Sequence, residues 1–98
     1  MTGLSRTSAD LDPRRKRILF RAWHRGTREM DLIMGRWTES VIDTLSDAEM
    51  DTLEVLIEQT DRELFSWISQ SEPVPVEHDT PVFRALMAFH THDKPIDL

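Results

Sequence analysis

Helix-start signals recur along this chain of 98 residues and constrain its fold more than any other feature. Two kinds are present: a capping residue followed by proline, and a serine or threonine followed three residues later by glutamate. They occur at Asp12-Pro13, Thr80-Pro81, Ser46 with Glu49, and Thr60 with Glu63. The chain also has 3 glycines, no tyrosine and almost no alternating β-branched runs, which disfavours strands. We therefore expect an all-α fold.

Apolar residues follow each start with the spacing of one helix face. In the first two expected helices the inward residues are Ile18, Leu19, Ala22 and Trp23, then Met30, Ile33, Met34 and Trp37. The expected helices run from Pro13 to Gly26, onward from Thr27, over 38–44, over 47–59, from Thr60 to 69–72, and from Pro81 to Lys94-Pro95. The fifth should bury Leu64, Phe65, Trp67 and Ile68. Pro73 and Pro75 predict an extended connector before the last helix. We infer a small antiparallel bundle of five or six helices over residues 13–92, with a flexible tail at 1–12 and a second tail at 93–98.

The composition, 39% apolar and 31% charged, is that of a soluble globular protein, and the length suffices for one small domain. No apolar run approaches the roughly 20 residues that a membrane-spanning helix needs. Cysteine is absent, which excludes disulfides and thiolate chemistry, and the first 12 residues lack the apolar block of a signal peptide. We expect a cytoplasmic protein that does not insert into membranes.

Charge is distributed unevenly along the chain. The net charge is -6, but residues 1–36 carry nine basic and four acidic side chains, whereas 37–98 carry three basic and fourteen acidic ones. The basic side chains of the first helix and its end are Arg14, Arg15, Lys16, Arg17, Arg21, Arg25 and Arg28. Such a row suits nucleic-acid phosphates, but the protein is acidic and no glycine-linked recognition helix follows. A solvated helix face and an interaction face for an acidic protein surface or a ligand phosphate both stay open.

No group of residues has the spacing of a catalytic or metal site. His90 and His92 with Asp93 suggest a metal, but His-x-His on a helix directs the two rings about 200° apart. No cysteine and no helical His-x-x-x-His supplies further ligands. The glycines stand alone at 3, 26 and 35, so no glycine-rich loop could hold a nucleotide, and no serine lies in a nucleophile elbow. We therefore predict that the protein is not an enzyme and binds no metal.

The remaining candidate is the segment Arg25-Gly26-Thr27-Arg28-Glu29, between the first two predicted helices. One interpretation is a helix stop at Gly26 and a capped restart, with Glu29 at the positive end of the helix dipole. The other interpretation is a functional corner. Because glycine has no side chain, another backbone or a ligand could approach it closely, between the opposite charges of Arg25 and Glu29.

Three segments, in order, carry a family resemblance. They are Arg25-Gly26-x-x-Glu29 followed by Asp31-Leu32-Ile33-Met34, then Leu45-Ser46-x-x-Glu49, then Asp61-x-Glu63-Leu64-Phe65-x-Trp67 leading into Pro73. With these segments the chain resembles, from about Arg15 to His90, the FAD assembly factor family of succinate dehydrogenase, known in bacteria as SdhE and in mitochondria as assembly factor 2. The chain departs from the family pattern at Thr27 and Arg28, which make the corner more polar, and at Trp23-His24.

The resemblance implies a five-helix bundle that promotes covalent attachment of FAD to the flavoprotein subunit of succinate dehydrogenase and, in some bacteria, of fumarate reductase. It implies no catalytic residue of the ordinary kind: the protein would hold its client so that a client histidine attacks the flavin methyl carbon. FAD would be handled in the client, with no cofactor bound stably here, and we expect a monomer. When the family's motif is matched to this chain residue by residue, the resemblance implies that Arg25, Gly26, Glu29 and Asp31 bind the client. Arg21 and Arg17 would extend this surface.

The alternative from another class is a nucleic-acid-binding or antitoxin-like regulator that uses the basic first helix. Phosphate binding weakens steeply as salt rises, so a gel-shift assay at near-physiological salt distinguishes the two hypotheses. We favour the assembly factor, and expect no nucleic-acid partner.

Overall fold

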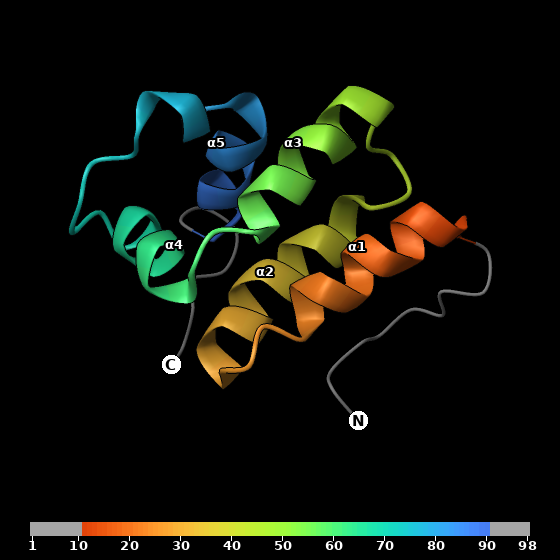
Figure 1. Cartoon of the computed structure of the whole chain (residues 1–98), viewed down its shortest axis with the longest axis horizontal. Helices are drawn as coiled ribbons and strands as arrows, with labels where there is room; N and C mark the ends of the chain where they lie inside the picture. Colours follow the sequence, from red (N-terminus) through yellow and green to blue (C-terminus); the bar gives the residue numbers. More distant parts are fainter. Residues whose placement is uncertain (1–10, 91–98) are drawn as a thin grey trace. The chain divides into compact units, whose positions relative to one another are not determined.

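The computed structural model describes residues 11–90, and these form helices joined by short connections (Figure 1). The elements are α1 (Pro13–Trp23), α2 (Arg28–Val41), α3 (Asp47–Ile57), α4 (Asp61–Ile68), the short 3-10 helix η1 (Val76–His78) and α5 (Pro81–Ala88). The described residues contain no strand, so the predicted all-α fold with five α-helices is confirmed. The structure does not describe residues 1–10 of the predicted tail at 1–12, nor the predicted helix end at Lys94-Pro95 and the predicted tail at 93–98. Leu11 is described and is buried.

The helix starts lie where the capping residues predicted them. The carboxylate of Asp12 accepts the backbone N–H of Arg15 at 2.9 Å, and Pro13 is the first residue of α1. At α3 the Ser46 hydroxyl accepts the backbone N–H of Glu49 at 3.1 Å, while the Glu49 carboxylate accepts that of Ser46 at 2.8 Å, which completes a capping box. Backbone donors that a helix cannot satisfy internally are therefore satisfied by local side chains.

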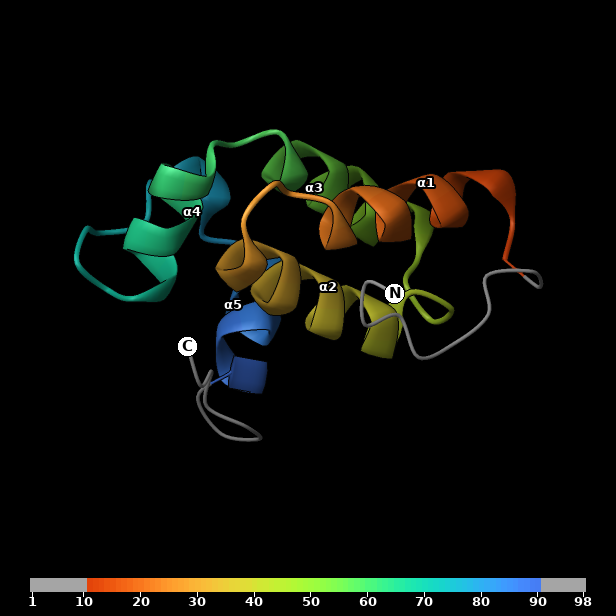
Figure 2. The same ribbon diagram turned by 90° about the horizontal axis from the view of Figure 1, so that it is seen from below.

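The chain divides into two compact units. Unit 1 extends to Leu45 and contains α1 and α2, and unit 2 begins at Ser46 and contains the remaining elements. In unit 1 the two helices form an antiparallel hairpin and lie side by side in both views (Figures 1 and 2). The buried side chains of the hairpin are Ile18, Leu19, Ala22, Trp23, Met30, Ile33, Met34 and Trp37. These are the residues that the helical spacing predicted to face inward.

At Gly35 the backbone of α2 lies very close to a side chain of α1. A Cβ atom added to Gly35 would lie 2.3 Å from Cδ2 of Trp23, far inside van der Waals contact. The Trp23 ring is only 3% exposed, and its indole nitrogen has no hydrogen-bond partner in the described part of the chain. Glycine at 35 thus lets the backbone of α2 pack directly against the face of a large aromatic ring.

The separate helix predicted over 38–44 is wrong. α2 continues without a break to Val41, and residues 42–44 form a turn. The reason is that the buried face of α2 continues past Thr38, from Trp37 to Ile42, so tertiary packing keeps the helix intact there. Thr38 lies inside the helix and is fully buried, so its hydroxyl does not cap a new one. The helix ends at the turn, where the backbone N–H and the hydroxyl of Thr44 both donate to the Val41 carbonyl, each at 2.9 Å.

Unit 2 is organised around apolar residues of α3, α4 and α5. The buried ones are Met50, Leu53, Leu56, Ile57, Leu64, Trp67, Val82, Phe83 and Leu86. Trp67 stacks on His78 of η1 and meets Phe83 edge to face, with ring centroids 5.1 and 6.4 Å apart. Phe65, predicted to be buried, is 40% exposed instead. An eight-residue helix has one covered face, and Leu64 and Trp67 occupy it.

Candidate functional site

The connection between α1 and α2 is a corner closed by one carboxylate. An Asp31 oxygen accepts the backbone N–H groups of Arg25 at 2.6 Å and of Gly26 at 3.2 Å. Thr27 caps α2, because its hydroxyl oxygen accepts the N–H of Met30 at 3.3 Å. Gly26 has a φ of +112°, a conformation that residues with a side chain rarely adopt. The corner is therefore fixed by local hydrogen bonds and by glycine.

The outer side of this corner is open. Gly26, Arg28 and Glu29 are exposed, and Arg25 and Asp31 are half-buried. A Cβ atom added to Gly26 would meet no other atom of the described chain within 4 Å. Glycine is thus required here by the backbone conformation and not by a neighbouring part of the chain. The same open space would let a partner approach the Gly26 backbone, beside the exposed carboxylate of Glu29.

The structure gives Asp31 a role that the sequence interpretation did not include. Its carboxylate oxygen is already engaged by two backbone N–H groups of the corner. Asp31 therefore positions Arg25 and Gly26, while a contact between Asp31 and a client stays a prediction.

The arginines of α1 fall into two groups. Arg15 points inward: its guanidinium pairs with the Asp12 carboxylate at 2.7 Å and donates to the backbone carbonyls of Ile42, at 2.8 Å, and Leu45. It ties the start of α1 to the turn after α2. The backbone N–H of Arg15, helped by its guanidinium, also holds the pKa of Asp12 below its ordinary value. Arg15 thus belongs to the fold of unit 1.

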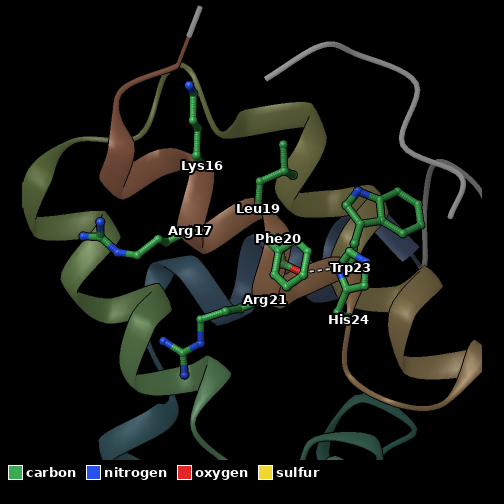
Figure 3. A pocket seen from close by; sticks show the side chains of 7 residues that line it. All are labelled: Lys16, Arg17, Leu19, Phe20, Arg21, Trp23 and His24. Atoms are coloured by element: carbon green, nitrogen blue, oxygen red, sulfur yellow. Dashed lines mark hydrogen bonds between the residues drawn. The ribbon is translucent and has the colours of Figure 1, made fainter. Parts of the chain in front are cut away.

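Arg17 and Arg21 lie on the opposite side of α1 and line a groove of about 420 Å³ (Figure 3). The described lining consists of Lys16, Arg17, Leu19, Phe20, Arg21, Trp23 and His24. None of these residues carries a carboxylate, so the groove combines positive charge with an aromatic surface. We name it the α1 groove.

Phe20 and His24 form the aromatic part of the α1 groove. Their rings stack at a centroid distance of 3.9 Å, with an angle of 18° between planes. The Nδ1–H of His24 donates to the Phe20 carbonyl at 2.7 Å, since a carbonyl oxygen can only accept (Figure 3). Phe20 remains 62% exposed. The sequence analysis did not select Lys16, Phe20 or His24, although a phenylalanine among the basic residues of a helix's polar face was a usable signal.

Residues 11–90 contain no candidate metal site. They contain no group of three or more histidine, cysteine, aspartate or glutamate side chains that could hold a metal ion. His90 is buried and packs edge to face on Phe89, with ring centroids 5.0 Å apart, whereas His92 and Asp93 lie outside the described residues. Within the same part of the chain, no helix combines the length and the apolar character needed to cross a bilayer.

The fold and these surfaces define a class: a small all-α protein whose candidate site is a solvent-exposed corner and groove on one helical hairpin, suited to binding another molecule. Comparison with protein families narrows this class. Residues 16–90 match the family described as flavinator of succinate dehydrogenase, and the chain belongs to this family. The resemblance inferred from the three sequence segments is thereby confirmed.

Curated relatives support the same assignment. The chain is 38% identical over 78 residues to the FAD assembly factor SdhE of Acetobacter pasteurianus, covering 80% of this chain and 72% of that protein. It is 28% identical over 88 residues to the mitochondrial succinate dehydrogenase assembly factor 2 of Dictyostelium discoideum, covering 90% and 62%. For the Arabidopsis thaliana protein of that name, identity is 30% over 71 residues, covering 71% and 38%. No solved structure shows a significant match.

Proposed function

We propose that this protein is an assembly factor that promotes covalent attachment of FAD to the flavoprotein subunit of succinate dehydrogenase, with the flavoprotein subunit of fumarate reductase as a second client. In this proposal it acts as a cytoplasmic monomer, binds no cofactor stably and contributes no catalytic residue. The observation that carries it is the family match over residues 16–90, which includes both the corner and the α1 groove.

The client-binding part of the proposal depends on the corner. Gly26 and Glu29 are exposed next to each other, and Asp31 holds the backbone beneath them in one conformation. A surface that is ordered before binding loses less conformational entropy when the partner docks. Arg25 provides a guanidinium at the same corner, and Arg21 and Arg17 continue the positive surface along α1.

The proposed mechanism is differential binding. If this protein binds the client more tightly in the conformation in which the client's histidine faces the flavin methyl carbon, it raises the population of that conformation. Holding two reacting groups together can remove a large part of a barrier without any reacting atom from the protein that holds them. The bond-forming histidine and the flavin both belong to the client, so the residues of this chain need only bind and orient.

Two substitutions at Gly26 test the proposal. Gly26→Arg places a long side chain on the open side of the corner, and Gly26→Ala places only a methyl group there. Both impose the same backbone conformation on a residue with a Cβ atom, with a cost of about 1 to 3 kcal/mol, and neither Cβ meets other atoms of the chain. The pair therefore separates steric block of a partner from backbone strain.

The assay is flavinylation of the apo flavoprotein subunit, measured by in-gel flavin fluorescence. We expect Gly26→Arg to lose most of the stimulation while Gly26→Ala retains much more of it, at equal folded fractions checked by circular dichroism. Glu29→Ala should weaken co-purification of the client. Wild-type stimulation by Gly26→Arg would contradict docking at the corner, and absence of stimulation by the wild-type protein would contradict the function itself.

A further inference from the structure

We infer that the α1 groove binds an acidic segment of the client protein that carries one large apolar side chain, which packs on the Phe20–His24 stack. The identity of the client rests on the proposed function, but the chemistry of the segment follows from the groove. Neither the family match nor the names of the relatives assign a role to Phe20 or His24.

An exposed phenylalanine beside the charged face of α1 is the first observation. Phe20 is 62% exposed, whereas four apolar neighbours on α1, Ile18, Leu19, Ala22 and Trp23, are almost fully buried. At about 100° per residue, Phe20 lies beside Trp23 at the edge of that buried face, and His24 lies opposite the face, among Lys16, Arg17 and Arg21. An exposed phenylalanine stacked on a second ring at that position provides an apolar anchor point for a partner.

The aromatic surface is held in place before binding. The stack on His24 fixes the Phe20 ring, and the hydrogen bond from His24 Nδ1 to the Phe20 carbonyl fixes the histidine on the last turn of α1. Because the two rings are stacked, His24 covers one face of the Phe20 ring, and the rest of the ring stays exposed as an apolar floor beside the mouth of the groove (Figure 3). Because these side chains are already ordered, a partner gains contact area with a small loss of rotamer freedom.

The charges around this floor define the partner as acidic. Lys16, Arg17 and Arg21 line the groove, and no carboxylate stands among its described lining residues. Guanidinium groups bind carboxylates through paired hydrogen bonds, so acidic residues next to the apolar anchor would be held on either side of the stack. A nucleic acid could also use arginines and a stacking ring. We favour a protein segment, because a short acidic segment carries far fewer charges against the total of -6 than a long polyanion does, and because the Arg15 guanidinium is engaged inside the fold.

A peptide experiment tests the groove with the full-length protein. The probe is a short synthetic peptide with one tryptophan between glutamate pairs; the controls replace tryptophan by serine or glutamate by lysine. Binding is followed by backbone-amide NMR shifts. We expect the acidic tryptophan peptide alone to bind, with shifts centred on 16–24 and an affinity that falls as salt rises above physiological ionic strength. Phe20→Ala should weaken binding at least about tenfold, since truncating a central aromatic anchor has that effect. Phe65→Ala, a matched exposed phenylalanine on α4, should not change it.

Equal affinity of the tryptophan and serine peptides, or no effect of Phe20→Ala, would overturn the inference. So would Phe20-dependent binding of single-stranded RNA in place of the acidic peptide. A parallel measurement uses the apo flavoprotein subunit of succinate dehydrogenase. If the wild-type protein binds this subunit and Phe20→Ala binds equally well, the inference fails and the proposed function stands. If the wild-type protein does not bind the subunit, the proposed function fails, and the peptide experiment alone decides on the groove.

Discussion

The contact between Gly35 and Trp23 makes the stability of unit 1 sensitive to a single methyl group. In an ordinary helix interior, replacing glycine by alanine stabilises the helix by about 1 kcal/mol, because alanine has the best helix propensity and glycine one of the worst. Propensity alone therefore predicts that Gly35→Ala stabilises α2. The packing predicts the opposite, since the added Cβ would lie 2.3 to 2.6 Å from three carbons of the Trp23 ring.

The size of the effect follows from how far the ring must move. Carbon atoms in favourable contact are about 3.5 to 4.0 Å apart, so the rigid and buried ring has to shift by more than about 1 Å. Overpacking of this kind costs about 1 to 3 kcal/mol, and we take the upper end because three ring atoms are affected. After the propensity gain is subtracted, Gly35→Ala should lower the free energy of unfolding by about 2 kcal/mol. For a domain of this size, that lowers Tm by about 8 to 16 °C.

Urea unfolding followed by far-UV circular dichroism measures this difference, and a double-mutant cycle assigns its cause. Trp23→Leu alone should destabilise, because it leaves a cavity. In the Trp23→Leu background, however, Gly35→Ala should become neutral or stabilising, because the ring that it meets is gone. A coupling energy of about 2 kcal/mol or more between the two sites is expected. An unchanged or raised urea midpoint for Gly35→Ala in the wild-type background would refute the reasoning.

Two further predictions concern side chains that hold unit 1 together. Asp31→Ala leaves the Arg25 and Gly26 N–H groups without their acceptor and should destabilise by about 1.5 to 3 kcal/mol; Asp31→Asn keeps an oxygen acceptor and should recover part of this in urea unfolding. The lowered pKa of Asp12 means that its stabilising effect is complete above the pKa of the unfolded chain and is lost as pH falls through the folded value. The difference in urea midpoint between wild type and Asp12→Asn should therefore shrink from pH 6 to pH 3, and a constant difference would contradict this.

The features that the sequence predicted well are those that depend on neighbours within a few residues. Asp12, Ser46 and Thr60 cap helices in the structure because a capping side chain reaches a backbone N–H three positions later, whatever the rest of the chain does. The inward face of α1 followed from the 3.6-residue period for the same reason. The error at 38–44 was of another kind, because tertiary packing buries Thr38 inside a continuous helix, and the residues next to it in the chain do not reveal that packing.

The features that could not be predicted from the sequence are those that depend on contacts between residues far apart in the chain. The need for glycine at 35 exists only because Trp23 packs on that turn of α2. The inward direction of Arg15 depends on the carbonyls of Ile42 and Leu45, about thirty residues away in the chain. For the candidate site, the corner was visible as a motif, whereas the role of Asp31 within it needed the geometry of the turn.

The uneven charge of the chain affects how an acidic partner would approach. Residues 1–45 carry nine basic and six acidic side chains, a net of +3, whereas residues 46–98 carry three basic and twelve acidic ones, a net of -9. At low ionic strength fields extend beyond the size of one unit, so the total of -6 opposes an acidic client even while the α1 groove attracts it. At physiological ionic strength, screening over about 8 Å weakens charge interactions beyond direct contact, so direct contacts of Arg17 and Arg21 with a docked carboxylate lose least. Moderate salt should therefore favour docking at unit 1, and only higher salt should weaken it.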